Sequence, residues 1–153
     1  MKKFELTSET KINIFGKKLF RIKALVSFGV VKTGETGGWV EKEENVNQSG
    51  DAWVFGNAEV FGNARVSGDA WVFGNAEVSG NADYTTIHGF GTQFRTTTFF
   101  RCKDKQVKVS CGCFYGTIPE FREQVKNTRD GKIAEEYLMI ADLMEKHFAE
   151  EAK

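Results

Sequence analysis

The side chains best suited to acid–base chemistry in this sequence are few and scattered. Of the two histidines, His88 is the only candidate general base, because His147 lies in a predicted helix and is assigned a surface or packing role. Glu59 and Glu77 are eighteen residues apart, and two carboxylates that lie close together can have their pKa values driven apart. We expect both glutamates on a regular exposed face without a pocket, so we assign them no catalytic role.

Three cysteines fall within residues 102–113, and their thiols are candidates for metal binding or redox chemistry. Cys111 and Cys113 share a face if this segment is a strand, with Cys102 on a neighbouring strand. A closed structural zinc site needs four ligands, and the spacing supplies no fourth. We therefore expect three small, buried, apolar residues, with zinc binding and redox chemistry as the alternatives.

The strongest pattern in the sequence is an eighteen-residue repeat, which positions Glu59 and Glu77. Residues 49–66 and 67–84 are identical at fifteen of eighteen positions, and the pattern Ala-x-Val-x-Gly-Asn/Asp recurs with a period of six. Residues two apart share a face of a strand, so each alanine points inward with the valine that follows it. The Gly-Asn and Gly-Asp pairs supply corners. The repeat therefore predicts a mainly β fold, with a left-handed triangular hexapeptide-repeat β-solenoid over residues 37–90.

The segments on either side of the repeat predict different units. Residues 1–36 alternate as strands and predict an N-terminal hairpin. Residues 91–153 predict an α/β cap, in which a β-hairpin precedes two helices. Thr117 and Glu120 have the spacing of a capping box at the start of the first helix. The second helix carries an apolar stripe formed by Tyr137, Ile140, Ala141, Met144 and Phe148. We expect the cap to cover the open end of the solenoid or to contact another subunit.

The stretch GGWVEKEENVNQSGDAWVFGNA, with LFRIKAL before it and TTTFFRCKD, VKVSCGCFYGT and two helices after it, resembles hexapeptide-repeat β-solenoid proteins of phages, prophages and their bacterial hosts. That family implies no settled activity. The repeat is more distantly similar to hexapeptide acyltransferases and γ-class carbonic anhydrases, which implies homotrimers formed through the sides of the solenoid. The acyltransferases use a histidine as general base, so the similarity makes His88 a candidate for acyl transfer. The carbonic anhydrases bind zinc with three histidines, and this chain has two.

One outward face of the predicted solenoid is aromatic. Positions eighteen apart lie one coil above another, so we expect Trp53 to stack on Trp71 and Phe55 to stack on Phe73. Such a patch covers roughly several hundred Å², the size at which an exposed apolar surface usually marks an interface. We predict a homotrimer interface here. The alternatives are a cover formed by the N-terminal strands or the C-terminal unit, and a surface that binds a foreign partner or a base.

Charge and composition limit the partners. The 21 basic and 21 acidic side chains balance, which disfavours nucleic acid and a membrane surface, although a small basic cluster lies near residues 95–105. A chain with 41% hydrophobic residues can bury a core. No apolar run approaches the roughly 20 residues of a membrane helix, and the N-terminus has no signal-peptide pattern. An odd number of cysteines in a short stretch fits a reducing compartment, so we predict a cytoplasmic protein.

The hypothesis that best combines these observations is a non-enzymatic, homo-oligomeric binding protein with no cofactor, metal or catalytic residue. The resemblance implies an accessory or counter-defence factor that inhibits a host defence protein or sequesters a small, nucleotide-like ligand between subunits. The side chains expected to hold such a ligand are Arg95, Arg101 and Lys103 for phosphates, Phe99 or Trp71 for stacking, and His88 beside them. A structural or assembly module and an acyltransferase that uses His88 are the alternative functions.

Overall fold

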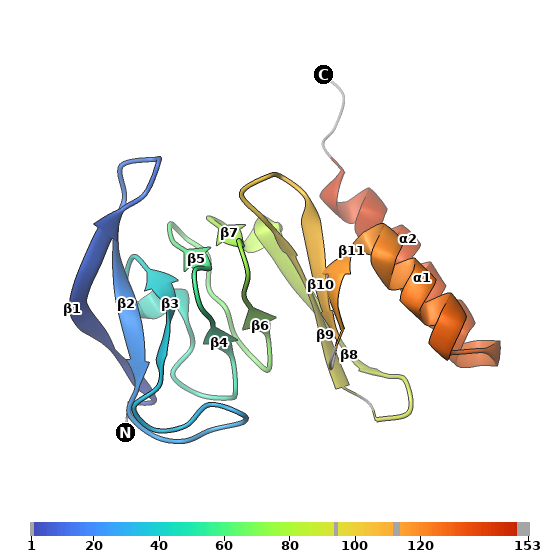
Figure 1. Ribbon diagram of the computed structural model, residues 1–153, viewed down its shortest axis with the longest axis horizontal. Helices are drawn as coiled ribbons and strands as arrows, with labels where there is room; N and C mark the ends of the chain where they lie inside the picture. The colour runs from blue at the N-terminus through green and yellow to red at the C-terminus, as the bar shows by residue number, and fades with distance from the viewer. Residues whose placement is uncertain (1, 94, 112–113, 150–153) are drawn as a thin grey trace.

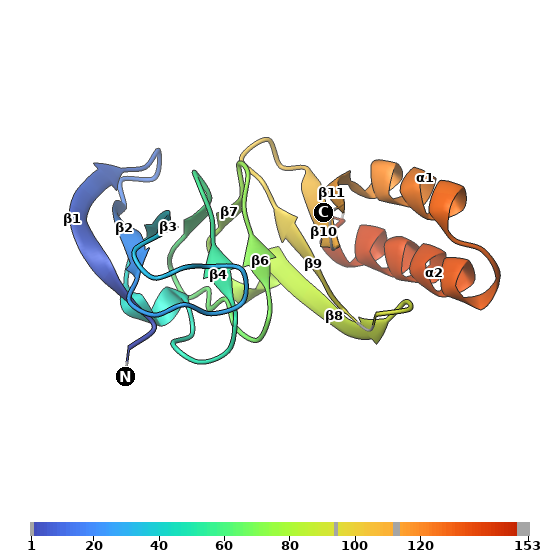
Figure 2. The ribbon, with the colours of Figure 1, turned by 60° about the horizontal axis from the view of Figure 1, so that its bottom comes forward.

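The computed structural model describes residues 2–93, 95–111 and 114–149. The strands are β1 (Phe4–Ile12), β2 (Lys18–Ala24), β3 (Thr36–Val40), β4 (Trp53–Val54), β5 (Glu59–Val60), β6 (Trp71–Val72), β7 (Glu77–Val78), β8 (Tyr84–Phe90), β9 (Arg95–Arg101), β10 (Val107–Cys111) and β11 (Phe114–Thr117). The α-helices are α1 (Ile118–Thr128) and α2 (Gly131–Phe148), and two short 3₁₀ helices span Glu43–Asn45 and Asn81–Asp83. Figures 1 and 2 show the two α-helices side by side at the end of the molecule opposite the N-terminus.

The strands belong to three separate sheets. A five-stranded mixed sheet has the order β1-β2-β3-β5-β7, and a four-stranded antiparallel sheet has the order β11-β10-β9-β8. The third sheet contains only β4 and β6, which pair in parallel. Pairing between β2 and β3 and between β8 and β9 crosses both of the segment boundaries expected from the sequence, at residues 36/37 and 90/91. The chain is therefore a mixed α/β protein in which the flanking strands extend the pairing of the repeat.

The prediction of a left-handed hexapeptide β-solenoid is wrong. Residues eighteen apart do pair, as Trp53 with Trp71 and Glu59 with Glu77, but these strands are two residues long and lie in different sheets. Where a third solenoid side was expected, the described residues show only an isolated bridge between Val46 and Val66. The physical reason is length: two eighteen-residue blocks fall short of the three repeats that usually make such a stack stable. On the N-terminal side β3 pairs in parallel with β5, and on the C-terminal side an isolated bridge joins Ala76 to Cys102.

Two hydrophobic cores lie on opposite sides of β9. The alanines and valines of the repeat pack with Phe4, Trp53 and Phe100 in the first core. Phe99 and Val109 pack with both helices in the second. Because neighbouring residues of a strand point to opposite faces, Phe99 and Phe100 belong to different cores. The four-stranded sheet is therefore covered by the repeat on one face and by α1 and α2 on the other (Figure 1).

The two-helix segment follows several local predictions. Thr117 caps α1 through its side chain, and Glu120 bonds back to the Thr117 backbone, which confirms the capping box. The five residues of the predicted apolar stripe on α2 are all buried. They pack against the four-stranded sheet and α1, in place of the solenoid end that we expected. No helix in the described part of the chain is long and apolar enough to cross a membrane.

Candidate functional site

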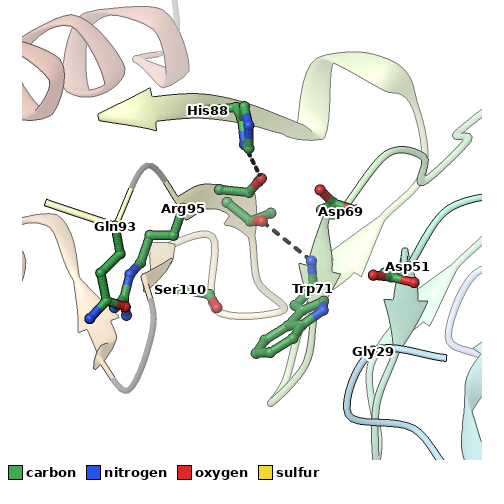
Figure 3. A pocket seen from close by; sticks show the side chains of 10 residues that line it. Gly29, Asp51, Asp69, Trp71, His88, Gln93, Arg95 and Ser110 are labelled. Carbon is green, nitrogen blue, oxygen red and sulfur yellow. Dashed lines mark hydrogen bonds between the residues drawn. The ribbon is translucent and has the colours of Figure 1, made fainter. Parts of the chain in front are cut away.

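An open pocket of about 400 Å³ lies between the repeat and the four-stranded sheet. We call it the Trp71 pocket (Figure 3). Its lining residues are Gly29, Asp51, Asp69, Trp71, His88, Gln93, Arg95, Thr96, Thr98 and Ser110. The β2–β3 loop, two corners of the repeat, and strands β6, β8, β9 and β10 thus all contribute to one cavity.

Two glycine corners place the acidic side of the pocket. Gly50 and Gly68 have φ values of +75° and +63°, a conformation that glycine adopts readily, and each precedes an aspartate of the pocket. The buried Lys3 ammonium donates to the carbonyl oxygens of Ala52 at 2.7 Å and Gly50 at 3.3 Å, which fixes the corner that carries Asp51. Burial lowers the pKa of Lys3 to about 8, while the nearby Asp51 carboxylate acts in the opposite direction.

Hydroxyl groups of the four-stranded sheet form the opposite wall. Thr98 of β9 and Ser110 of β10 are opposite each other in register, and both are buried. The Thr98 hydroxyl accepts a hydrogen bond from the Trp71 backbone N–H at 3.3 Å, which joins this wall to the repeat. On the neighbouring strand pair, His88 Nδ1 and Thr96 Oγ1 lie 2.8 Å apart and share a hydrogen bond. These bonds hold the imidazole and the indole on fixed strands at the pocket edge.

Charged groups are separated across the pocket. Figure 3 shows Arg95 and Gln93 on one side and Asp51 and Asp69 on the other, with the Trp71 indole between them. The Arg95 guanidinium donates to the Gln93 side-chain oxygen. A guanidinium suits phosphate or carboxylate, whereas carboxylates accept hydrogen bonds from hydroxyl and amino groups. The half-exposed indole offers a surface for a planar ring. The pocket therefore fits a ring that carries an anionic group at one end and donors at the other.

The ligand-binding residues expected from the sequence lie in four places. The pocket contains Arg95, His88 and Trp71. Phe99 is buried in the second core, and Arg101 pairs with Asp83 at 3.2 Å. Lys103 pairs with Glu59 at 2.9 Å on another part of the molecule. The sequence analysis missed Gly29, Asp51, Asp69, Gln93, Thr96, Thr98 and Ser110. Only the two aspartates carried a signal, because they recur eighteen residues apart, two positions before each repeat tryptophan.

The four aromatic residues of the predicted interface differ in exposure. Trp53 is fully buried, because the rings of Phe4 and Phe28 pack edge-on against it with centroids 5.9 and 5.2 Å away. Phe55, Trp71 and Phe73 are half-buried. Phe73 is partly covered by Tyr115 of β11, at 4.5 Å between ring centroids. Phe4 of β1 and Phe28 of the β2–β3 loop thus cover Trp53 within one chain, whereas the other three rings keep some exposed surface.

The glutamate pair lies in a different environment from the exposed face that we expected. Glu59 is 3% exposed, and its carboxylate forms ion pairs with Lys11 at 3.0 Å and Lys103 at 2.9 Å. A cavity of about 240 Å³ adjoins it and Glu77. Burial alone would raise the pKa of Glu59, but the bonds and charges of the two lysines outweigh burial and lower it. The Glu59 carboxylate therefore links three segments of the chain and is neutralised by cations.

The two cysteines among the described residues, Cys102 and Cys111, are not part of the Trp71 pocket lining. Cys102 is buried in the first core, where burial and the charge of Asp104 raise the pKa of its thiol to about 12. Cys111 Sγ accepts a hydrogen bond from Thr97 Oγ1 at 3.1 Å, and Cys113 lies outside the described residues. Among the described side chains, no group of three or more histidine, cysteine, aspartate or glutamate residues is arranged to hold a metal ion.

No protein-family model matches this sequence, nor does any curated protein. A functional assignment for the chain therefore depends on the geometry of the Trp71 pocket.

Proposed function

We propose that the protein binds and sequesters a small nucleotide in the Trp71 pocket, without chemical turnover. One observation carries the proposal: an indole, a guanidinium and two carboxylates from three separate segments face the same cavity of about 400 Å³. That volume is within the range of small-molecule sites, about 300–1,000 Å³. An aromatic surface, a cation and acceptors are the groups that a base, a phosphate and a ribose or base donor require.

Each group of the pocket can bind a different part of a nucleotide. Stacking of a base on an aromatic side chain contributes about 1–3 kcal/mol, and it tolerates every base because each has a π face. Arg95 provides charge-assisted hydrogen bonds to a phosphate, and Gln93 orients its guanidinium. Asp51 and Asp69 can accept hydrogen bonds from ribose hydroxyl or base amino groups. The polar groups surround the cavity and do not converge on a single reacting atom, which favours binding over catalysis (Figure 3).

Replacement of Trp71 by alanine is expected to weaken nucleotide binding by roughly 10- to 100-fold, as the loss of one stacked base predicts. The measurement is isothermal titration of the purified protein with AMP, GMP, CMP and UMP. Trp71→Phe is the matched variant, because it keeps a ring and should retain most of the affinity. Failure of all four nucleotides to bind the folded protein would contradict the proposal, as would equal affinities of wild type and Trp71→Ala.

Replacement of Arg95 by alanine is expected to abolish the preference for a phosphate. The wild type should bind AMP at least about tenfold more tightly than adenosine, because hydrogen bonds to charged groups contribute about 1.5–3 kcal/mol. In Arg95→Ala the two affinities should become nearly equal. Arg122→Ala is the matched control, since this arginine pairs with Asp142 and Glu145 on the helices. A preference for AMP that survives in Arg95→Ala places the phosphate elsewhere.

The His88 position on the pocket wall also gives the acyltransferase alternative a direct test. If the imidazole acts as a general base, acetyl-CoA should be consumed in the presence of a small amine or alcohol acceptor, and His88→Ala should abolish the turnover. The binding proposal expects no turnover and only a modest change in nucleotide affinity in that variant. Turnover of acetyl-CoA that depends on His88 would replace the proposal.

A further inference from the structure

A second pocket, which we call the Arg65 pocket, is lined by neighbouring residues of the repeat and of β8. It has a volume of about 360 Å³ and is lined by Arg65, Ser67, Tyr84, Thr85 and Thr86. Like the Trp71 pocket, it is bounded on one side by the repeat and on the other by β8.

The two pockets share the same pair of chain segments. Along the repeat, Arg65 and Ser67 line the second pocket and the next residues, Asp69 and Trp71, line the first. Along β8 the order is the same, because Tyr84–Thr86 line the second pocket and His88 lines the first. Side chains two apart on a strand share a face and lie about 7 Å apart. Thr86 and His88 therefore lie on the same face of β8, so the two cavities follow one another along this strand, and we call them together the trench.

The chemistry of the Arg65 pocket differs from that of its neighbour. It holds one guanidinium, three aliphatic hydroxyl groups and the ring of Tyr84. The Arg65 side chain is oriented by a hydrogen bond from Nε to the Glu44 carbonyl oxygen at 3.3 Å. The Tyr84 hydroxyl donates to the Arg65 backbone carbonyl, which fixes the other wall. A cation with several hydroxyl donors suits a second phosphate or a sugar, and none of the described residues that line this pocket carries a carboxylate.

We infer that the ligand is a dinucleotide that occupies both cavities. One nucleotide lies in the Trp71 pocket, and the phosphate and sugar of the other lie beside Arg65. This inference rests on the proposed function, since it extends the same site along the trench. Two cavities that follow one another along β8, each lined by its own arginine, match a ligand with two linked phosphate-bearing units. A mononucleotide would leave the Arg65 pocket empty.

The test compares the affinity for a mononucleotide with the affinity for a dinucleotide. We expect the linear dinucleotide pApA to bind at least tenfold more tightly than AMP in isothermal titration, and pGpG likewise compared with GMP. In Arg65→Ala the affinity for pApA should fall to within about threefold of that for AMP, while AMP binding stays unchanged. Arg122→Ala is the matched surface control. The Tyr84 hydroxyl bonds to the backbone of Arg65, so the Arg65→Ala substitution leaves that hydrogen bond intact. Circular dichroism of Arg65→Ala should confirm an unchanged fold.

Each outcome separates the inference from the proposed function. If mononucleotides bind but pApA and pGpG gain no affinity, or if Arg65→Ala leaves the gain intact, the inference is overturned and the proposed function stands. If no mononucleotide or dinucleotide binds, both fall. If a ten-residue oligoadenylate binds more than tenfold more tightly than pApA, the trench holds a nucleic-acid strand and the dinucleotide assignment is overturned.

Discussion

Replacement of Trp53 by alanine is expected to lower the free energy of unfolding by about 3–5 kcal/mol, the usual cost of removing a large buried aromatic side chain. Trp53 is fully buried and contacts Phe4 and Phe28, so its loss leaves a cavity where the N-terminal strands meet the repeat. For a chain of 153 residues, a loss of this size corresponds to a fall in Tm of roughly 10 °C. Urea denaturation and thermal unfolding measure it.

Trp71→Ala is the matched control for this prediction, because Trp53 and Trp71 occupy the same place in the repeat and pair directly. Trp71 is half-exposed at the pocket, so its removal should cost less than about 1.5 kcal/mol of stability while it weakens ligand binding. Equal destabilisation by the two substitutions would contradict the assigned roles, in which Trp53 supports the fold and Trp71 faces the ligand.

Trp53→Phe should cost less than half as much as Trp53→Ala. The Trp53 indole nitrogen is buried and has no hydrogen-bond partner within the described part of the chain. A buried donor without a partner carries a desolvation penalty of about 1–3 kcal/mol, and phenylalanine removes it while keeping most of the ring contacts. The same denaturation experiment tests this prediction. If Trp53→Phe is as unstable as Trp53→Ala, the loss of ring volume alone determines the stability, and the unpaired N–H has no measurable cost.

The two tryptophans show which features the sequence could predict. Local rules worked: the eighteen-residue spacing gave the pairing of Trp53 with Trp71, and the Thr117/Glu120 spacing gave the helix cap. These depend on neighbours along the chain or on the period of a strand. They say nothing about which segment covers each copy of the repeat. Phe28, which packs on Trp53, comes from the loop after β2 and follows no periodic pattern.

The fold class and most of the pocket depended on such long-range contacts. The solenoid was extrapolated from two blocks, whereas the strands on either side supply most of the sheet pairing. The expected ligand set assumed that the basic residues after position 94 act together. Alternation along β9 places Phe99 in the helical core, whereas Arg95 lines the pocket from the first position of the strand. The turn after β9 places Lys103 beside Glu59. Sequence spacing within one strand cannot show which partner each face meets.

Glu59 and Glu77 are also equivalent positions of the repeat, and they differ in the role of their charge. We expect their substitution by glutamine to change the free energy of unfolding in opposite directions. Glu59→Gln should lower the free energy of unfolding at pH 7 by about 2 kcal/mol. Breaking a buried ion pair costs about 3–5 kcal/mol, and the lower figure reflects Lys11 and Lys103, which are 32% and 42% exposed and can be solvated. Glu77→Gln should raise the free energy of unfolding by about 0.2–1 kcal/mol, because it removes a like charge directly opposite Glu59.

The dependence on pH distinguishes these effects from changes in packing. The pKa of Glu59 lies below its ordinary value of 4.5, so the stability that its charge contributes is present above about pH 4.5 and is lost as the pH falls further. Burial and the charge of Glu59 raise the pKa of Glu77, so the cost of its charge is relieved as the pH falls through that raised value. For each variant, the difference from wild type in the free energy of unfolding should therefore be largest near pH 7 and become smaller in acid. As the pH falls, the difference for Glu77→Gln should shrink before the difference for Glu59→Gln. If the Glu59→Gln difference stays constant from pH 7 to pH 3, the lost contribution is shape and not charge, and the two lysines do not hold the three segments together through Glu59.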